Sequence, residues 1–360
     1  MSNFDPNRSN LRSMKKLVLL VTSFILLSVN ILNVGFLSSC KKQENTPPLK
    51  VGLIAGLGTF NDRGFNQQAL NGLIAAGYEV PIEYEAREIN TAADIDSNIQ
   101  YFVRNNFNLI ITLGYDAAQA TMNAATANPS IRFLLLDYTF TTIPKNMICV
   151  NYQVDQASFP CGFLAAWWAN QKNPVDPKIA YVGGPEISEI QQFSKSYSKG
   201  VEYFNTLYHT HVEVLGAYAN NFNDTLQGAQ LADSLINKGA EVVFACAGKT
   251  GNGALYKTKE AGKQGIGVDI DQYLSIPEVG PILLTSCVKR LDIIVLQEVI
   301  NACNGTFWGN TAIHCTLANQ GIGMAPYHDF DLLIPADIKQ AVEDVKTGIM
   351  NGTISTGWPE

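Results

Sequence analysis

Short apolar runs alternate with longer amphipathic stretches along most of this 360-residue chain. The runs are rich in Val, Ile and Leu and carry few polar residues, which is typical of strands buried on both faces of a parallel sheet. They are Lys50–Ala55, Leu109–Leu113, Arg132–Leu136, Met147–Val150, Lys178–Val182, Val212–Leu215, Glu241–Ala245, Gly265–Val268 and Ile282–Ser286. Helical spacing is found in Asn66–Ala76, Asp94–Asn105, Ala117–Ala127, Phe159–Asn170, Ile190–Thr206, Asp224–Lys238 and Ala254–Ala261. The alternation predicts an α/β fold with parallel sheets flanked by helices.

The predicted strand–helix units fall into two groups of similar size, separated by the polar, Pro-containing segment Gln171–Pro177. We therefore expect an N-terminal lobe over residues 50–154 that is completed by part of 290–360. The second lobe is expected over 155–289, and crossover and terminal helices over 290–360. Ligands of parallel sheets bind at the carboxyl ends of the strands, so two facing lobes would form a cleft from those ends.

The first forty residues differ from the rest of the chain. Lys15 and Lys16 precede a run from Leu17 to Phe36 that contains no charged residue, which is the layout of an export signal. The run ends in Leu37-Ser38-Ser39-Cys40, which resembles the bacterial lipobox, whose cysteine is acylated. We expect a lipoprotein signal peptide over 1–39, an acylated Cys40 that anchors the protein to a membrane, and a polar tether over 40–49. An uncleaved, membrane-spanning signal anchor is the alternative.

The composition excludes several classes of protein. Hydrophobic residues make up 46% of the chain and charged residues 16%, enough apolar material for packed cores, so a disordered chain is excluded. A net charge of -7 argues against nucleic acid as a partner. Cys40 leaves six of the seven cysteines, an even number that permits disulfides without specifying a pairing. The chain has no C-x-x-C motif or Cys/His cluster, so we expect no metal site.

Short polar side chains follow several of the predicted strands. Asn61, Asp62 and Asn66 stand at a helix entrance, where they can either cap the helix or contact a ligand. Asp116 and Asp137 each come shortly after a strand. A carboxylate there can accept hydrogen bonds from hydroxyl groups or ring nitrogens, although we expect Asp116 to cap the next helix.

Three further strand ends carry polar or glycine-rich segments. Gly248-Lys249-Thr250 matches the end of a phosphate-binding Walker A motif, but Val243 stands where that motif requires glycine, so triphosphate binding is excluded. We expect a glycine-rich turn from Gly248 to Gly253, whose backbone N–H groups face a ligand. Asp269 and Asp271 are two residues apart, and we expect only one of them to reach a given ligand. Lys289 follows the last run and could pair with a carboxylate across the cleft.

The motifs of catalysis are missing from the sequence. None of its four histidines stands in a nucleophile or metal motif, and no G-x-S-x-G segment occurs. We therefore expect no catalytic residue and no cofactor.

Taken together, the motifs resemble the basic membrane protein family of bacterial lipoproteins, which includes purine nucleoside receptors of ABC importers. The Gly267–Gln272 segment matches the family motif G-V-D-x-D-Q and is the most specific mark. The matching positions run in family order across residues 51 to about 350: Asn61–Asn66, Gly183-Gly184, Phe222 before Asp224, Gly248, Gly251, Gly253, Gly267–Gln272, Ser286 and Lys289, with Cys40 ahead of them.

The resemblance implies a two-lobed periplasmic-binding-protein fold of type I, like that of ribose-binding protein, with a nucleoside held between the lobes. It also implies an ABC permease as partner, a bilayer contacted through acylated Cys40, and a monomeric protein. In the family, two aromatic rings sandwich the base while acidic, Gly and Lys groups hold the base edge and the ribose. By motif position, Asp62 and Asp137 would contact the base, Phe222 one face of it, and Gly248, Asp269 and Lys289 the ribose.

Two positions depart from the family pattern. Leu70 stands where the family usually has Phe or Trp, and Gly64 replaces the usual Ser. A neighbouring aromatic such as Phe60 or Phe65 would then be needed to complete the sandwich, which leaves open a ligand other than a purine nucleoside. The alternatives are a periplasmic enzyme acting on nucleosides or sugars, with Asp137 or Asp269 as general base, and a surface-displayed binding protein without a transport role.

Overall fold

Two six-stranded sheets organise residues 47–359, the part of the chain that the computed structural model describes. The first consists, in spatial order, of β11 (Thr311–Cys315), β5 (Met147–Tyr152), β4 (Arg132–Leu136), β3 (Leu109–Leu113), β1 (Leu49–Ile54) and β2 (Ile82–Arg87). The second consists of β12 (Ile322–Met324), β10 (Leu283–Lys289), β9 (Gln264–Asp269), β8 (Ala240–Cys246), β6 (Lys178–Gly183) and β7 (Glu213–Tyr218). All pairings are parallel except that between β10 and β12.

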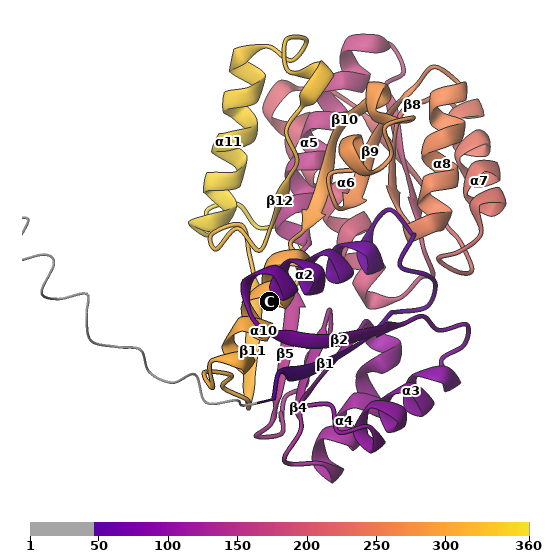
Figure 1. Cartoon of the computed structure of the whole chain (residues 1–360). Coiled ribbons are helices and arrows are strands. Elements are labelled where there is room, and N and C mark those ends of the chain that lie inside the picture. Colours follow the sequence, from indigo (N-terminus) through magenta and orange to yellow (C-terminus); the bar gives the residue numbers. More distant parts are fainter. Residues whose placement is uncertain (1–46, 360) are drawn as a thin grey trace, which may run out of the picture. The chain divides into compact units, whose positions relative to one another are not determined.

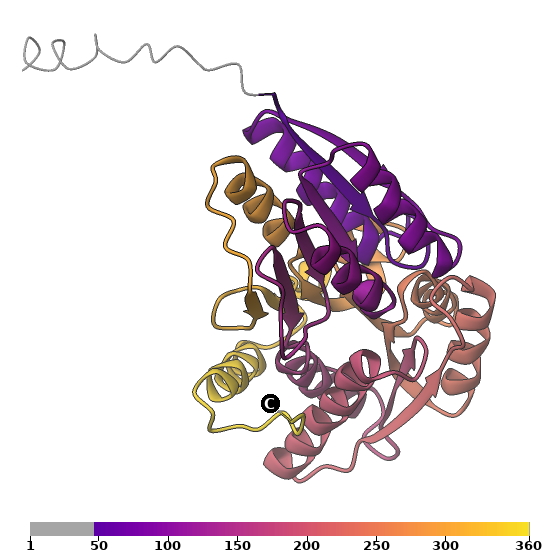
Figure 2. The same ribbon diagram turned by 90° about the horizontal axis from the view of Figure 1, so that it is seen from below.

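Helices cover both sheets, as Figures 1 and 2 show. Those of the first sheet are α2 (Phe65–Glu79), α3 (Ala93–Arg104), α4 (Ala118–Ala127) and α10 (Leu291–Cys303). Those of the second are α5 (Asp155–Lys172), α6 (Ser188–Tyr208), α7 (Thr225–Asn237), α8 (Gly248–Glu260), α9 (Gln272–Ser275) and α11 (Ala336–Met350). Successive residues of β1 pack into different cores, Leu53 with α2 and Ile54 with α3, so both faces of this sheet are buried. The predicted α/β class is thereby confirmed.

The two sheets with their helices form an N-terminal and a C-terminal lobe within one compact unit, Pro48–Glu360. The chain crosses from lobe to lobe three times, between β5 and α5, between β10 and α10, and between β11 and β12. The segment that contains α10 and β11 therefore lies with the N-terminal lobe, while β12 and α11 lie with the C-terminal lobe. These three crossings are the connections between the lobes, and we call them the hinge.

The strands missed by the sequence analysis are β2, β11 and β12, and all three lie at the edge of a sheet. An edge strand is covered on fewer sides, so it does not need a continuous apolar run. No residue of β2 is buried, and only Cys315 is buried in β11, whereas every residue of β3 is buried.

Several sequence-based expectations fall outside the described residues. These are the signal peptide over 1–39, the acylation of Cys40 and most of the tether.

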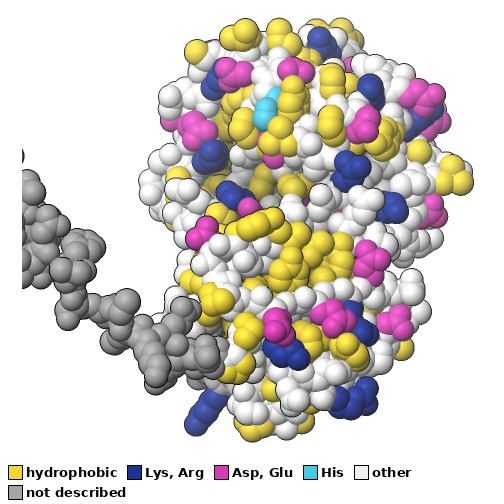
Figure 3. All heavy atoms as spheres, in the orientation of Figure 1, with side chains coloured by type: hydrophobic (Ala, Val, Ile, Leu, Met, Phe, Trp, Pro, Cys, Tyr) yellow, Lys and Arg dark blue, Asp and Glu magenta, His cyan; other side chains and the backbone are white. Residues whose placement is uncertain are grey.

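Within the described part, no helix is both long and apolar enough to cross a bilayer, and the six cysteines are free thiols. On the face shown in Figure 3, acidic and basic side chains are interspersed over both lobes.

Helices α7 and α8 approach each other through glycines. A Cβ added at Gly253 would overlap the carbonyl oxygen of Thr225, and one added at Gly228 would overlap that of Thr250. Gly253 was expected in a glycine-rich turn, and that expectation is wrong, because α8 already begins at Gly248. These glycines bring two helix backbones into contact.

Replacing Gly253 with Ala should therefore lower the free energy of unfolding by about 1–3 kcal/mol, the usual cost of overpacking. An ordinary helical Gly→Ala change has the opposite sign and stabilises by about 1 kcal/mol. Urea unfolding would measure the difference. Gly323→Ala is the control, because a Cβ there meets nothing within 4 Å. Equal stability of Gly253→Ala and the wild type would contradict the close-contact explanation.

Candidate ligand-binding site

A cavity lies between the lobes, at the carboxyl ends of the strands of both sheets. Its empty space is about 770 Å³, including the open mouth. The residues that line it on the N-terminal lobe are Gly56, Leu57, Asp62, Phe65, Asn66, Leu113, Gly114, Tyr115, Asp116 and Asp137. Those on the C-terminal lobe are Ile187, Glu189, Ile190, Phe193, Phe222, Asn223, Cys246, Gly248, Lys249, Val268, Asp269 and Lys289.

Seven of the nine residues proposed from the sequence line this cavity: Asp62, Asn66, Asp137, Phe222, Gly248, Asp269 and Lys289. The other two are placed elsewhere. Asn61 is exposed and accepts a hydrogen bond from the Arg63 side chain (3.2 Å), while Leu70 packs against the hydrophobic core. Polar groups from segments more than 200 residues apart in the sequence therefore meet in one cavity.

Asp62 organises the start of α2. Its carboxylate accepts hydrogen bonds from the backbone N–H groups of Gly64 (2.9 Å), Asn66 (2.8 Å) and Gln67 (3.1 Å). Burial raises the pKa of Asp62, although these three hydrogen bonds act in the opposite direction. Next to it, the Oδ1 atom of Asn66 accepts a hydrogen bond from the N–H of Gly56 (2.8 Å), which fixes the loop after β1. Asp62 thus both caps the helix and faces the cavity.

A buried lysine links the lobes. The Nζ atom of Lys289 lies 2.7 Å from Oδ2 of Asp137, and the Lys289 residue is only 4% exposed. Burial alone would lower the pKa of Lys289, but Asp137 and Asp269 outweigh it and leave that pKa raised. Burial raises the pKa of Asp269 to about 7, against the opposing effect of Lys289. The three side chains therefore form a charged group whose members depend on one another.

Asp137 and Asp269 occupy equivalent positions in the two lobes. Asp137 follows β4, and Asp269 ends β9, which has the same place in the second sheet as β4 has in the first. Both residues have a φ of 65°, in the left-handed region that Asp tolerates better than most residues. The chain thus leaves both strands by the same backbone turn, and both carboxylates reach the cavity.

Four aromatic residues line the cavity, Phe65 and Tyr115 from the N-terminal lobe and Phe193 and Phe222 from the C-terminal lobe. Phe222 belongs to the C-terminal lobe, and Gly184 leaves room for its ring, which a Cβ at that position would overlap. Phe65 opens α2 in the N-terminal lobe, with Lys289 Nζ 5.4 Å from the centre of its ring. Of the two candidates for completing an aromatic pair, Phe65 lines the cavity and Phe60 does not.

The segment that follows β9 holds Asp269 in place. The Oε1 atom of Gln272 accepts a hydrogen bond from the N–H of Val268 (2.9 Å), and its Nε2 donates to Asn252 (3.0 Å). The backbone N–H of Gln272 donates to Ser286 Oγ in β10 (3.1 Å). Gln272 therefore ties β9 to β10 and α8 without itself lining the cavity.

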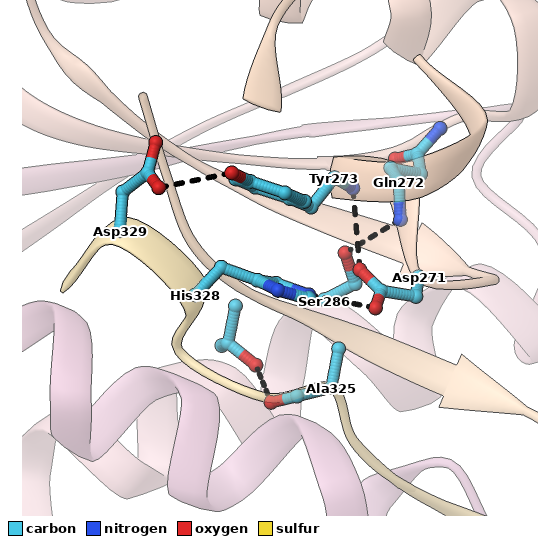
Figure 4. A network of polar contacts seen from close by, with 8 residues as sticks. Asp271, Gln272, Tyr273, Ser286, Ala325, His328 and Asp329 are labelled. Atoms are coloured by element: carbon cyan, nitrogen blue, oxygen red, sulfur yellow. Dashed lines mark hydrogen bonds and ion pairs between the residues drawn. The ribbon is translucent and has the colours of Figure 1, made fainter. Parts of the chain in front are cut away.

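Asp271 belongs to a separate network, drawn in Figure 4. Its carboxylate accepts a hydrogen bond from the N–H of Tyr273 (3.2 Å) and lies 2.7 Å from Nε2 of His328. The Tyr273 ring stacks on His328 with centroids 3.9 Å apart, and its hydroxyl donates to Asp329 (2.9 Å). Asp271 lines a different groove from Asp269, which confirms that only one of the two carboxylates faces the ligand cavity.

The sequence analysis did not assign two acidic residues that line the cavity, Asp116 and Glu189, to the ligand site. Asp116 was expected to cap a helix, but it lines the cavity, and burial raises its pKa. Glu189 lies in the first turn of α6, and burial raises its pKa as well. Glutamate is so common in the first turn of a helix that nothing in the sequence distinguishes Glu189. Among the described residues, no group of three His, Cys, Asp or Glu side chains could hold a metal ion.

The lobes are closed over the cavity by hydrogen bonds from the C-terminal lobe to the loop after β1. Asn223 donates to the carbonyl of Leu57 (3.3 Å) and Asn252 to that of Asp62 (2.8 Å). Arg63 and Ser275 bond reciprocally, each side chain donating to the other's carbonyl, at 2.8 and 3.0 Å. We call these four bonds the clasp.

Comparison with known proteins gives consistent findings. The family model described as "ABC transporter substrate-binding protein PnrA-like" matches residues 50–357. The "CD4+ T-cell-stimulating antigen" of Listeria monocytogenes is 28% identical over 94% of this chain and 98% of its own length. The "ABC transporter nucleoside-binding protein BmpA" of Lactococcus lactis is 27% identical over 95% of this chain and 99% of its own length.

Solved structures agree on the fold. A solute-binding protein of an ABC transporter system from Aeropyrum pernix K1 superposes with a TM-score of 0.80 at 22% identity. The match covers 86% of this chain and 93% of that chain. The expected periplasmic-binding-protein fold is thus confirmed.

The raised pKa of Asp269 predicts a pH dependence of stability. Between its ordinary value of 3.8 and about 7, the folded protein keeps a proton that the unfolded chain has released. The free energy of unfolding should therefore fall as pH rises through this range and level off above it. Asp269→Asn has no such proton, so urea unfolding from pH 4 to 8 should show the wild type losing stability relative to the variant. Parallel curves for the two proteins would contradict the prediction.

Proposed function

This chain belongs to the family of PnrA-like ABC transporter substrate-binding proteins, and on that basis we propose that it captures a nucleoside between its lobes for delivery to a membrane permease. The match over residues 50–357 confirms the resemblance to the basic membrane protein family. Membership implies a small-molecule ligand and a permease partner. The identity of the ligand as a nucleoside is the part that we propose.

The observation that carries the proposal is the pairing of Phe65 and Phe222 in one cavity with carboxylates. The two rings come from opposite lobes, and we place the base between them while the lobes are closed. Stacking on an aromatic side chain contributes about 1–3 kcal/mol per base. The nucleoside-binding role in the name of the Lactococcus lactis relative supports the same choice of ligand.

The polar groups of the cavity suit the rest of a nucleoside. Ribose hydroxyls are hydrogen-bond donors, and we assign Asp269, Lys289 and the backbone of Gly248 to them, because carboxylates accept strong hydrogen bonds from such donors. We assign Asp62 and Asp137 to the edge of the base. Oδ1 of Asp62 already accepts two backbone hydrogen bonds and Oδ2 accepts one, so Oδ2 keeps a further lone pair for the ligand.

Release to a permease would require the lobes to open at the hinge, which breaks the clasp. We propose that the ligand leaves chemically unchanged, since the family is described as substrate-binding. Incubating the protein with nucleosides and searching for free base by chromatography would detect an enzyme instead.

Phe222→Ala should weaken nucleoside binding by about tenfold to a hundredfold, because one stacking surface is lost. Isothermal titration against a panel of purine and pyrimidine nucleosides measures the change. Phe60→Ala is the matched control, since Phe60 lies on the loop before α2 but outside the cavity wall. Failure of every nucleoside to give heat or a thermal shift with the wild type would remove the nucleoside proposal. Equal affinity of Phe222→Ala and wild type would remove the stacking role.

We also propose that acylated Cys40 anchors the protein to a membrane. Cys40→Ser should abolish incorporation of labelled palmitate and move the protein from the membrane fraction to the soluble fraction. Cys303→Ser is the control, because Cys303 is a partly exposed thiol of the folded domain. Retention of the label in Cys40→Ser would sink the proposal.

A further inference from the structure

The ligand cavity adjoins a second, more polar chamber. This chamber has about 1,340 Å³ of empty space, including open solvent. It is bounded by the loop after β4, the crossing into α5, the first turn of α6 and the C-terminal tail from Gly352 to Pro359. The tail reaches the region where the lobes meet (Figure 1). Asp137, Glu189 and Lys289 line both cavities, so they form the wall between them.

Glu189 differs from the other acidic residues of the second chamber in having no side-chain partner among the described residues. Asp137 is paired with Lys289, and Asp155 accepts hydrogen bonds from Gln192 (2.7 Å) and Thr356 (2.6 Å). Across the described residues, the Glu189 carboxylate forms no ion pair and no hydrogen bond with another side chain. It is half-buried, and burial raises its pKa more than the hydrogen bond from its own backbone N–H lowers it. The remaining lone pairs of the carboxylate are available to a ligand.

The charge of the ligand cavity determines what Glu189 can accept. Five carboxylates and two lysines line that cavity, so it carries an excess of negative charge. A phosphate group would add about 1.5–2 further negative charges at pH 7. In a partly buried site such like charges repel much more strongly than in water. A hydroxyl or amine brought to the same position would instead supply the donor that Glu189 lacks.

We propose that Glu189 is a specificity-determining residue, and this inference rests on the proposed function. Glu189 accepts a hydrogen bond from a hydroxyl or amine at the sugar end of the nucleoside and repels a phosphate group there. The wall contains both Lys289, which we assign to the ribose, and Asp137, which we assign to the edge of the base, and we choose the sugar end because the phosphate of a nucleotide is attached there. The second chamber supplies the space into which a group attached to the sugar would extend.

The test compares a nucleoside with its own 5′- and 3′-monophosphates by isothermal titration. The nucleoside is the member of the panel that the wild type binds most tightly. Wild-type protein should bind at least one monophosphate about a hundredfold more weakly than the nucleoside, or more weakly still. Glu189→Gln should reduce this ratio of nucleoside affinity to monophosphate affinity by about tenfold or more, because one unit of like charge is removed. Raising the salt concentration should reduce this affinity ratio more in the wild type than in Glu189→Gln, because salt screens the repulsion between charges.

Glu186→Gln is the matched control, because Glu186 is exposed on the same segment and lines neither cavity. Glu189→Ser removes the same charge with less bulk and serves as a second variant, and thermal unfolding verifies that each variant is folded. An unchanged ratio in folded Glu189→Gln and Glu189→Ser, or equal binding of nucleoside and monophosphates by the wild type, overturns this inference while the proposed function stands. Absence of all nucleoside binding overturns both.

Discussion

A buried lysine, which pairs with Asp137 of the other lobe and whose pKa is raised by Asp137 and Asp269, joins the lobes at the wall of the cavity. Removing the Lys289 ammonium from water would cost several kcal/mol, and the carboxylates of Asp137 and Asp269 offset that cost only while they remain close to it. Asp137 belongs to one lobe and the other two residues to the other lobe. Since Lys289 is the last residue of β10, directly before a crossing, the position of the hinge and the position of this charge cannot be adjusted independently.

The two lobes repeat one strand order, and this repetition explains why the site is acidic. Each lobe places an aspartate at the carboxyl end of its fourth strand, in the same left-handed turn. When the lobes face each other, the two carboxylates necessarily approach. A single cation between them is the simplest way to bury both, and a ligand rich in hydroxyl donors can share the remaining acceptor capacity.

The sequence was sufficient for the fold class and for most of the residues that line the cavity. Buried strands such as β3 are apolar throughout, and polar residues directly after a strand, such as Asp137, can only lie at the edge of the sheet where ligands bind. Glu189 could not be found in this way, because its position depends on where α6 begins relative to the other lobe. The edge strand β12 was missed for a related reason, since it is short and pairs only with β10.

The same limit explains the outcome for Leu70. Motif spacing assigns a family position to that residue, but the rotation of α2 decides which of its side chains faces the cavity. The structure turns Phe65 inward and packs Leu70 against the core. A spacing rule identifies the helix, whereas the side of the helix that meets the ligand is set by the packing of α2 against α10.

The clasp has a property that follows from its chemistry. All four of its hydrogen bonds end on main-chain carbonyl oxygens, which every amino acid supplies. Three of the four donors, Asn223, Asn252 and Ser275, belong to the C-terminal lobe, and only Arg63 donates from the loop itself. Substitution of the loop side chains ahead of Arg63 during evolution therefore changes what the loop presents to a solute while all four acceptors of the clasp are kept.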